Sequence, residues 1–139
     1  MKRYLLILLL PLFFSCDDDN FNNRNPYIPS VGFSKSFDMN LPLYSELQYP
    51  GNSYHYLGPD AGVRGVIIFN TGSGFRAYDG ACPNQDLSSC STLNTSGSVA
   101  VCPCDDVQYN LFTGLGPGVE YPLKQYRVSV SGTVITVYN

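Results

Sequence analysis

The chain has 139 residues, a net charge of −3, and 13 Gly, 10 Pro, 11 Tyr and 8 Phe but no Trp. Its length suits one domain with a single core, and its turn-forming and aromatic residues are typical of a β protein rather than a helical bundle. The few basic residues do not cluster, which argues against nucleic acid and anionic membrane surfaces as binding partners.

The N-terminus has the pattern of a secretory leader. Met1-Lys2-Arg3 precedes an apolar run, Tyr4 to Phe14. That run is too short to span a bilayer, which requires about 20 residues, and it fits the apolar region of a signal peptide. It ends in F-F-S-C, which resembles a bacterial lipobox with Cys16 as the acylated residue. We therefore predict a lipoprotein signal peptide over residues 1–15; the alternative is an ordinary signal peptide cut nearby, with Cys16 incidental.

A polar segment follows the lipobox. The run D-D-D-N-F-N-N-R-N-P-Y-I after Cys16 lacks apolar periodicity, so residues 16–30 are predicted to be the acylated cysteine and a flexible acidic tether. The acidic residues are either a surface-export signal or a plain solvated spacer. The β domain then covers residues 31–139. We expect a lipid-anchored protein of the cell envelope, at the outer membrane, facing the periplasm or the outside, with an unknown envelope protein or ligand as partner.

The first half of the domain predicts short strands separated by turns. Gly32 to Leu47 predicts one strand, and Tyr49 to Gly58 a turn and a short extended piece. Val63 to Asn70 contains a continuous V-I-I-F run, which predicts a strand buried on both faces. A Thr-Gly-Ser-Gly turn leads to the return strand, Phe75 to Tyr78. The inward positions expected in the first strand are Phe33, Phe37, Met39 and Leu41.

The second half continues the pattern. Ser98 to Val101 and Val107 to Phe112 are predicted to be extended, and Tyr126 to Val130 forms a closing hairpin with Thr133 to Tyr138. No window has a persuasive helical period. The sequence therefore predicts an antiparallel all-β domain.

Four cysteines lie within 23 residues of the chain, and without Cys16 the number of cysteines is even. Each of two clusters contains a Cys-Pro pair, which predicts loops because proline lacks a ladder donor. The tract Ser88 to Ser98 joins them, and because it consists almost entirely of Ser, Thr, Asn and Gly we expect it to be solvated. Two such loops on a β scaffold hold a metal, a cluster or a pair of disulfides. The cysteines are Cys82, Cys90, Cys102 and Cys104.

These residues resemble the boxes of the Rieske iron–sulfur family. The second box here reads C-P-C-D-D-V-Q-Y-N-L-F-T-G, and the first reads C-P-N. The resemblance covers roughly Gly62 to Tyr138 and implies a Rieske-like antiparallel β-sandwich with both Cys-Pro loops at one end. It also implies a 2Fe–2S cluster. The residues that match the second box are Cys102, Pro103, Tyr109, Leu111, Thr113 and Gly114.

The sequence departs from the family at the cluster ligands. The family binds its exposed iron through two histidines, and the corresponding positions here are Asn84 and Asp105. A neutral amide is a poor iron ligand, and the one histidine of the chain, His55, lies outside both boxes. A site with two cysteines and two histidines is therefore impossible within this chain.

The resemblance also implies how the cysteines pair. Cys104 occupies the place of the cysteine that ties the two cluster loops in some Rieske proteins, which implies a Cys90–Cys104 disulfide. Cys82 and Cys102, the family's ligands of the buried iron, are then left together. In an oxidising compartment two adjacent thiols without a metal should also pair.

Four interpretations remain open. The first is a cluster-free, disulfide-stapled structural or binding module without a cofactor. The second is a 2Fe–2S electron-transfer protein that uses Cys82, Cys102, Asp105 and one unusual ligand. The third is zinc on the four cysteines, although C-P-C is tighter than the usual spacing. The fourth, thiol–disulfide exchange, is disfavoured because the sequence places neither a helix N-terminus nor a cation beside a cysteine.

Nothing in the sequence forms a catalytic constellation. A lone histidine leaves few nucleophile–base combinations, and His55 is most simply a surface or half-buried loop residue. The Asp105-Asp106 pair is more typical of a turn cap than of acid–base chemistry. The sequence therefore predicts a binding or structural module more readily than an enzyme.

Overall fold

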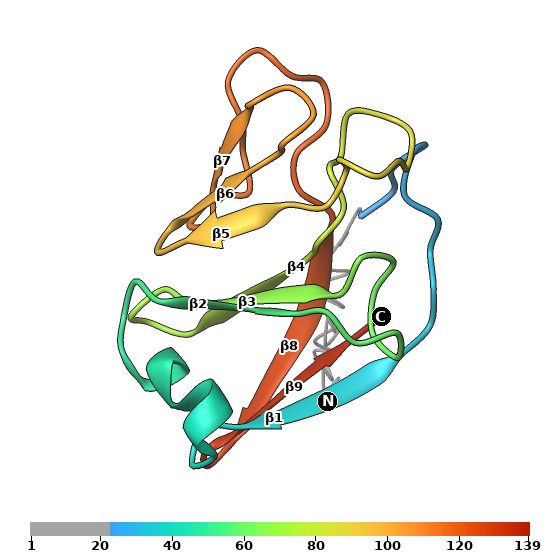
Figure 1. Ribbon diagram of the computed structural model, residues 1–139. Helices are drawn as coiled ribbons and strands as arrows, with labels where there is room; N and C mark the ends of the chain where they lie inside the picture. Colours follow the sequence, from blue (N-terminus) through green and yellow to red (C-terminus); the bar gives the residue numbers. More distant parts are fainter. Residues whose placement is uncertain (1–22) are drawn as a thin grey trace, which may run out of the picture.

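The computed structural model describes residues 23–139, which form two antiparallel sheets (Figure 1). The larger sheet has the strand order β1-β9-β8-β4-β3-β2, and the smaller has β5-β6-β7. The predicted leader and Cys16 lie outside the described residues. The strands are β1 (Ser34–Asp38), β2 (Ser53–Tyr56), β3 (Val66–Asn70), β4 (Phe75–Asp79), β5 (Asn94–Ser96), β6 (Val99–Val101), β7 (Gln108–Asn110), β8 (Gln125–Ser131) and β9 (Val134–Tyr138).

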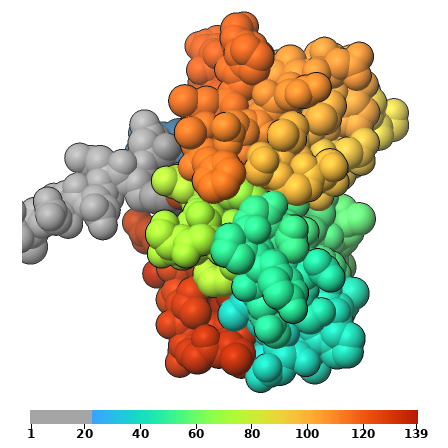
Figure 2. All heavy atoms as spheres, turned by 90° about the vertical axis from the view of Figure 1, so that its left-hand side faces the viewer, coloured from blue at the N-terminus to red at the C-terminus, as the bar shows by residue number. Residues whose placement is uncertain are grey.

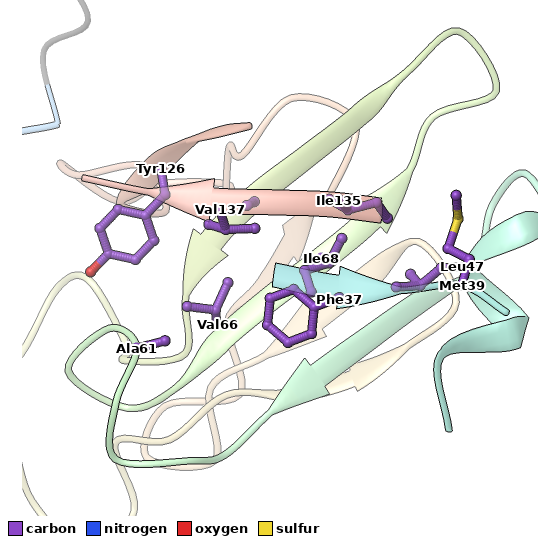
Figure 3. Packing of buried hydrophobic residues seen from close by; sticks show 10 residues of the cluster. Phe37, Met39, Leu47, Ala61, Val66, Ile68, Tyr126, Ile135 and Val137 are labelled. Carbon is purple, nitrogen blue, oxygen red and sulfur yellow. The ribbon is translucent and has the colours of Figure 1, made fainter. Parts of the chain in front are cut away.

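The six-stranded sheet curls so that its two edge strands approach each other. Phe37 of β1 meets Tyr56 of β2 edge to face, with ring centroids 5.3 Å apart. Lys35 Nζ lies 2.7 Å from an oxygen of Asp60, just beyond β2. The apolar side chains of both halves point into the space between them (Figure 3). The predicted sandwich is thus one curled sheet with its core inside.

Strand β3 is shared between two hydrophobic cores, which explains its unbroken apolar sequence. Because side chains alternate across a strand, Val66 and Ile68 face the core inside the curled sheet. Ile67 and Phe69 face a second core under the small sheet. All five residues of β3 are buried, as the V-I-I-F run predicts.

The small sheet and the long loops around it form a lobe on the outer face of β3 and β4. Figure 2 shows this lobe, in yellow and orange, as a bulge above the rest of the domain. Tyr78 anchors it, since its hydroxyl donates to the carbonyl oxygen of Leu111 at 2.9 Å. The second core fills the contact between the lobe and the large sheet. It contains Cys82, Leu93, Ala100, Cys102, Tyr109, Leu111 and Leu123.

Three local predictions are wrong. The single strand predicted over Gly32 to Leu47 ends at Asp38, and a 3-10 helix, η1 (Pro42–Gln48), follows. Leu41, predicted to point inward, is 51% exposed. Strand β5 and the buried Leu93 lie in the tract that the sequence assigned to a solvated connection.

Residues 23–30, predicted to be part of the tether, lie against the domain. The buried amine of Lys124 donates to the carbonyl oxygen of Asn23 at 2.6 Å. The side chain of Asn25 donates to the carbonyl oxygen of Pro83 at 2.8 Å, and Ile28 is buried. This part of the chain is therefore not a free spacer. Within residues 23–139 no helix is both long and apolar enough to cross a membrane.

A buried carboxylate joins the large sheet to the first cysteine loop. Asp79, at the end of β4, is fully buried, and its oxygens accept from the backbone N–H groups of Val63 at 2.6 Å and Ala81 at 2.8 Å. Arg64 N–H donates at 3.2 Å, and the Tyr126 hydroxyl of β8 donates at 2.6 Å. Burial raises the pKa of Tyr126, and the neighbouring Asp79 adds to the shift. The hydroxyl therefore remains a donor across the ordinary pH range.

We expect Tyr126→Phe to lower the free energy of unfolding by about 1.5–3 kcal/mol, because it removes a buried hydrogen bond to a charged group. Urea denaturation followed by circular dichroism measures this change. Tyr49→Phe is the control, since Tyr49 is 61% exposed and its substitution should change stability by less than about 0.5 kcal/mol. Equal effects of the two substitutions would contradict this account of Asp79.

Candidate functional site

Two disulfides hold the cysteine-bearing loops side by side. Cys82 is bonded to Cys102 with a Cα separation of 5.7 Å, and Cys90 to Cys104 with 5.1 Å. The disulfide pairing that the resemblance implies is therefore present in the structure. The first loop follows β4 and the second joins β6 to β7, so both lie at the same end of the domain.

The two disulfides have very different surroundings. Cys82 and Cys102 are 1% and 0% exposed and belong to the core under the small sheet. The side-chain amide of Gln85 lies over this bridge, 2.7 Å from Cys102 Sγ. Cys90 is exposed and Cys104 is half-buried. One bridge is thus part of the core, and the other lies at the surface.

Asn84 connects the first cysteine loop to a third loop. Its amide nitrogen donates to the Tyr121 carbonyl oxygen at 2.8 Å and to the Tyr109 hydroxyl at 2.9 Å. Its amide oxygen accepts from the Tyr121 N–H at 2.8 Å. These three bonds use both amide hydrogens and one oxygen acceptor site. Asn84 therefore holds residues 115–123 against the first loop.

Asp105 shapes the second cysteine loop and lies at its surface. Its carboxylate accepts from the Val107 N–H at 3.1 Å, the local bond that aspartate commonly makes in turns. Two backbone hydrogen bonds form the turn around Asp105. Asp106 N–H donates to the Cys102 carbonyl oxygen at 2.8 Å, and Cys102 N–H donates to the Val107 carbonyl oxygen at 3.0 Å. Asp106 has φ 60°, a left-handed conformation that aspartate tolerates better than most residues.

As arranged, the four ligand positions do not fit a 2Fe–2S cluster. The sulfurs of Cys82 and Cys102 are bonded to each other, so neither is a free thiolate. The amide of Asn84 is occupied by Tyr109 and Tyr121. In residues 23–139 no group of three or more His, Cys, Asp or Glu side chains is placed to hold a metal ion.

His55 does not contact either disulfide. It lies in β2, with Nε2 3.0 Å from the carbonyl oxygen of Arg64. The ring fills the space in front of Gly80, where a β-carbon would collide with both of these groups. Burial lowers the pKa of His55. Of the two placements predicted for this residue, surface or half-buried, the structure shows the second, although in a strand rather than in a loop.

Sequence reasoning missed the contacts that hold the loops. Ser88 Oγ lies 3.4 Å from Cys90 Sγ and 3.7 Å from Cys104 Sγ. Arg64 reaches the same loop, since its guanidinium donates to the Ser88 carbonyl oxygen at 3.0 Å. The Asn84–Tyr121 pair spans 37 residues. Only the spacing of Ser88 from Cys90 was a usable signal, because the other contacts depend on tertiary structure.

No family model matches the sequence, and neither does any of the curated proteins compared with it. Similarity to solved structures is nevertheless clear in the fold. The quaternary ammonium Rieske monooxygenase CntA is 14% identical, with a TM-score of 0.52, and the match covers 78% of this chain and 32% of that one. This chain thus spans about a third of the monooxygenase.

Two smaller proteins match over most of their length. The ferredoxin of carbazole 1,9a-dioxygenase from Nocardioides aromaticivorans IC177 is 18% identical, with 78% of this chain and 97% of that chain covered and a TM-score of 0.47. The Sphingomonas yanoikuyae B1 ferredoxin is 14% identical, with 66% and 88% covered and a TM-score of 0.46. At these identities the likeness concerns the fold alone. The chain has a Rieske-like fold, mostly β, with a curled antiparallel sheet and a small second sheet.

Replacing both Cys82 and Cys102 with Ala should lower the free energy of unfolding by about 2–5 kcal/mol, because it removes a cross-link and leaves a cavity in the core. Replacing Cys90 and Cys104 with Ala is the matched control. It opens a similar loop but leaves no buried cavity, so the loss should be smaller, about 2–3 kcal/mol. Urea denaturation of both variants measures the free energy of unfolding. A larger decrease for the Cys90, Cys104 variant would contradict the conclusion that Cys82–Cys102 is the bridge that belongs to the core.

Proposed function

We propose that this protein is a lipid-anchored, exported module in which covalent and hydrogen-bonded contacts replace an iron–sulfur cluster. It acts as a structural or binding domain rather than as an electron carrier. The proposal is supported mainly by the bonds that the residues at the expected ligand positions already make. Cys82 is bonded to Cys102, and the amide of Asn84 is bonded to Tyr121 and Tyr109.

The chemistry of these positions supports the proposal. A cluster ligand needs a free donor, and each of these residues already stabilises the loops in another way. Asp105 remains exposed, but one carboxylate does not replace two imidazoles. The two disulfides and the Asn84 hydrogen bonds already join the three loops, which supports a loop end that is ordered by these contacts.

The anchor limits where the module acts. If Cys16 is acylated, only residues 17–22 separate the lipid from the first described residue, Asn23. A chain of this length spans at most about 20–25 Å when fully extended. The domain therefore works close to the membrane, and its partner is an envelope protein or ligand within that distance.

The anchor is tested by Cys16→Ser. Because acylation requires the thiol of this residue, we expect the variant to remain uncleaved or to leave the membrane fraction. Membrane fractionation with metabolic labelling by a fatty acid measures both outcomes. Processing and membrane binding like those of the unsubstituted protein would overturn the lipoprotein assignment, and Ser15→Ala is the control that should leave both unchanged.

The absence of a cluster is tested on protein purified without oxygen. We expect a colourless protein, no titratable thiol in the folded or denatured state, and no iron. A brown protein with about two irons per chain would overturn the proposal, as would loss of that iron in the double Cys82→Ala, Cys102→Ala variant. Release of four thiols by a chelator would instead indicate zinc.

A further inference from the structure

We propose that the surface disulfide Cys90–Cys104 is a thiol-exchange site that accepts neutral or cationic thiols and discriminates against anionic ones. The inference goes beyond the proposed binding role, and it revises the expectation from the sequence that thiol–disulfide exchange is disfavoured, because the structure places the Ser88 hydroxyl beside both sulfurs. It rests on the surroundings of this bridge, which differ from those of Cys82–Cys102 in exposure, in a neighbouring hydroxyl and in local charge.

The first requirement of exchange is access of a thiolate to a sulfur. Cys90 is exposed and Cys104 is half-buried. The sulfurs of Cys82 and Cys102 are enclosed by the core and lie beneath the Gln85 amide. Because attack occurs at a disulfide sulfur, only the surface bridge can be reached without unfolding.

The second requirement is a stabilised leaving sulfur. Ser88 Oγ lies within hydrogen-bond range of both sulfurs of the surface bridge. Buried Ser91 fixes its position, because the Ser88 N–H donates to Ser91 Oγ at 2.7 Å and Ser91 Oγ donates to the Ser88 carbonyl at 3.0 Å. The Ser88 hydroxyl can therefore donate a hydrogen bond to the sulfur that departs.

The third requirement is that the reduced protein remains folded. Cys82–Cys102 still joins the same two loops when the surface bridge is open. Asn84 still joins the first loop to Tyr121. The two thiols therefore stay near each other, and the bridge can close again.

The charge around the bridge sets the preferred substrate. Asp86, Asp105 and Asp106 are exposed on the two loops that carry Cys90 and Cys104. Between Ala81 and Leu123 the sequence contains four acidic residues and no Lys, Arg or His. The guanidinium of Arg64 places one positive charge at the carbonyl oxygen of Ser88, fewer than the negative charges on the two loops. An approaching anionic thiol is repelled, and a cationic one is attracted.

The exchange balances as follows. The thiolate of a first partner thiol attacks Cys90 Sγ, a mixed disulfide forms, and the Cys90–Cys104 bond breaks with its electron pair on Cys104 Sγ, which takes a proton from solvent. A second partner thiolate attacks the partner sulfur of the mixed disulfide and releases Cys90 as a thiolate, which is then protonated. The bridge gains two electrons and two protons, and two partner thiols become one disulfide.

The test uses the folded, full-length protein and three small thiols of similar size: cysteamine, 2-mercaptoethanol and 3-mercaptopropionate. We expect release of two thiols, at Cys90 and Cys104, as identified by alkylation and peptide mass analysis. The second-order rate constant is expressed per thiolate and divided by the rate constant of the same thiol with an uncharged small disulfide, because thiolates differ in intrinsic nucleophilicity. This normalised rate constant should be about tenfold higher for cysteamine than for 3-mercaptopropionate at low salt, and the ratio should fall in 0.5 M NaCl.

Two sets of variants separate the parts of the proposal. Asp105→Asn with Asp106→Asn keeps the turn acceptors, and should reduce the charge preference severalfold while changing the 2-mercaptoethanol rate less than about twofold. Ser88→Ala should slow all three thiols and leave their ratio unchanged. Release of four thiols, release of none, or equal normalised rate constants for all three compounds would each overturn the proposal. None of these rate measurements depends on the lipid anchor.

Discussion

The structure of the loop end depends on the buried carboxylate of Asp79. A charge placed in the interior is costly unless donors surround it, and here three backbone N–H groups and the Tyr126 hydroxyl do so. Those donors come from the segment before β3, from the start of the first cysteine loop and from β8. Their common acceptor fixes Ala81 relative to β8, and hence Cys82 relative to the third loop. Asp79 thus sets the starting point of the first cysteine loop, and the disulfides tie that loop to the second.

The loop end shows how a β scaffold can remain ordered where the resemblance implies a cluster. Such a cluster would join two loops through bonds to iron. Here a disulfide joins the equivalent cysteines, and an amide makes three hydrogen bonds from the position of a histidine. Asn84, at the position where the resemblance implies a histidine, therefore keeps this part of the loop ordered through hydrogen bonds. The Asn84 side chain reaches the backbone of Tyr121, so the third loop, residues 115–123, is joined to the two cysteine loops.

The sequence predicted the parts of the fold that depend on local pattern. The V-I-I-F run indicated a strand buried on both faces, and β3 has this property because it lies between two cores. The helix η1 escaped prediction because it depends on tertiary packing, with Leu47 buried and Tyr44 against Phe37. The pairing of the four cysteines was predicted from the resemblance of the two Cys-Pro boxes to the Rieske family, and the structure contains both disulfides. The role of Asn84 could not be predicted, since an asparagine that reaches 37 residues along the chain has no sequence signature of its own.

The unequal burial of the two disulfides gives them different physical roles. A bridge inside a core contributes packing as well as restriction of the unfolded chain, and opening it would expose apolar surface around Leu93 and Ala100. The surface bridge contributes mainly the restriction, because Cys90 is exposed and only the half-buried Cys104 packs against that core. Because both bridges join the same pair of loops, the buried one preserves their arrangement whether or not the surface one is closed. The buried bridge therefore supplies the condition that the proposed exchange at the surface bridge requires, since it joins the same two loops.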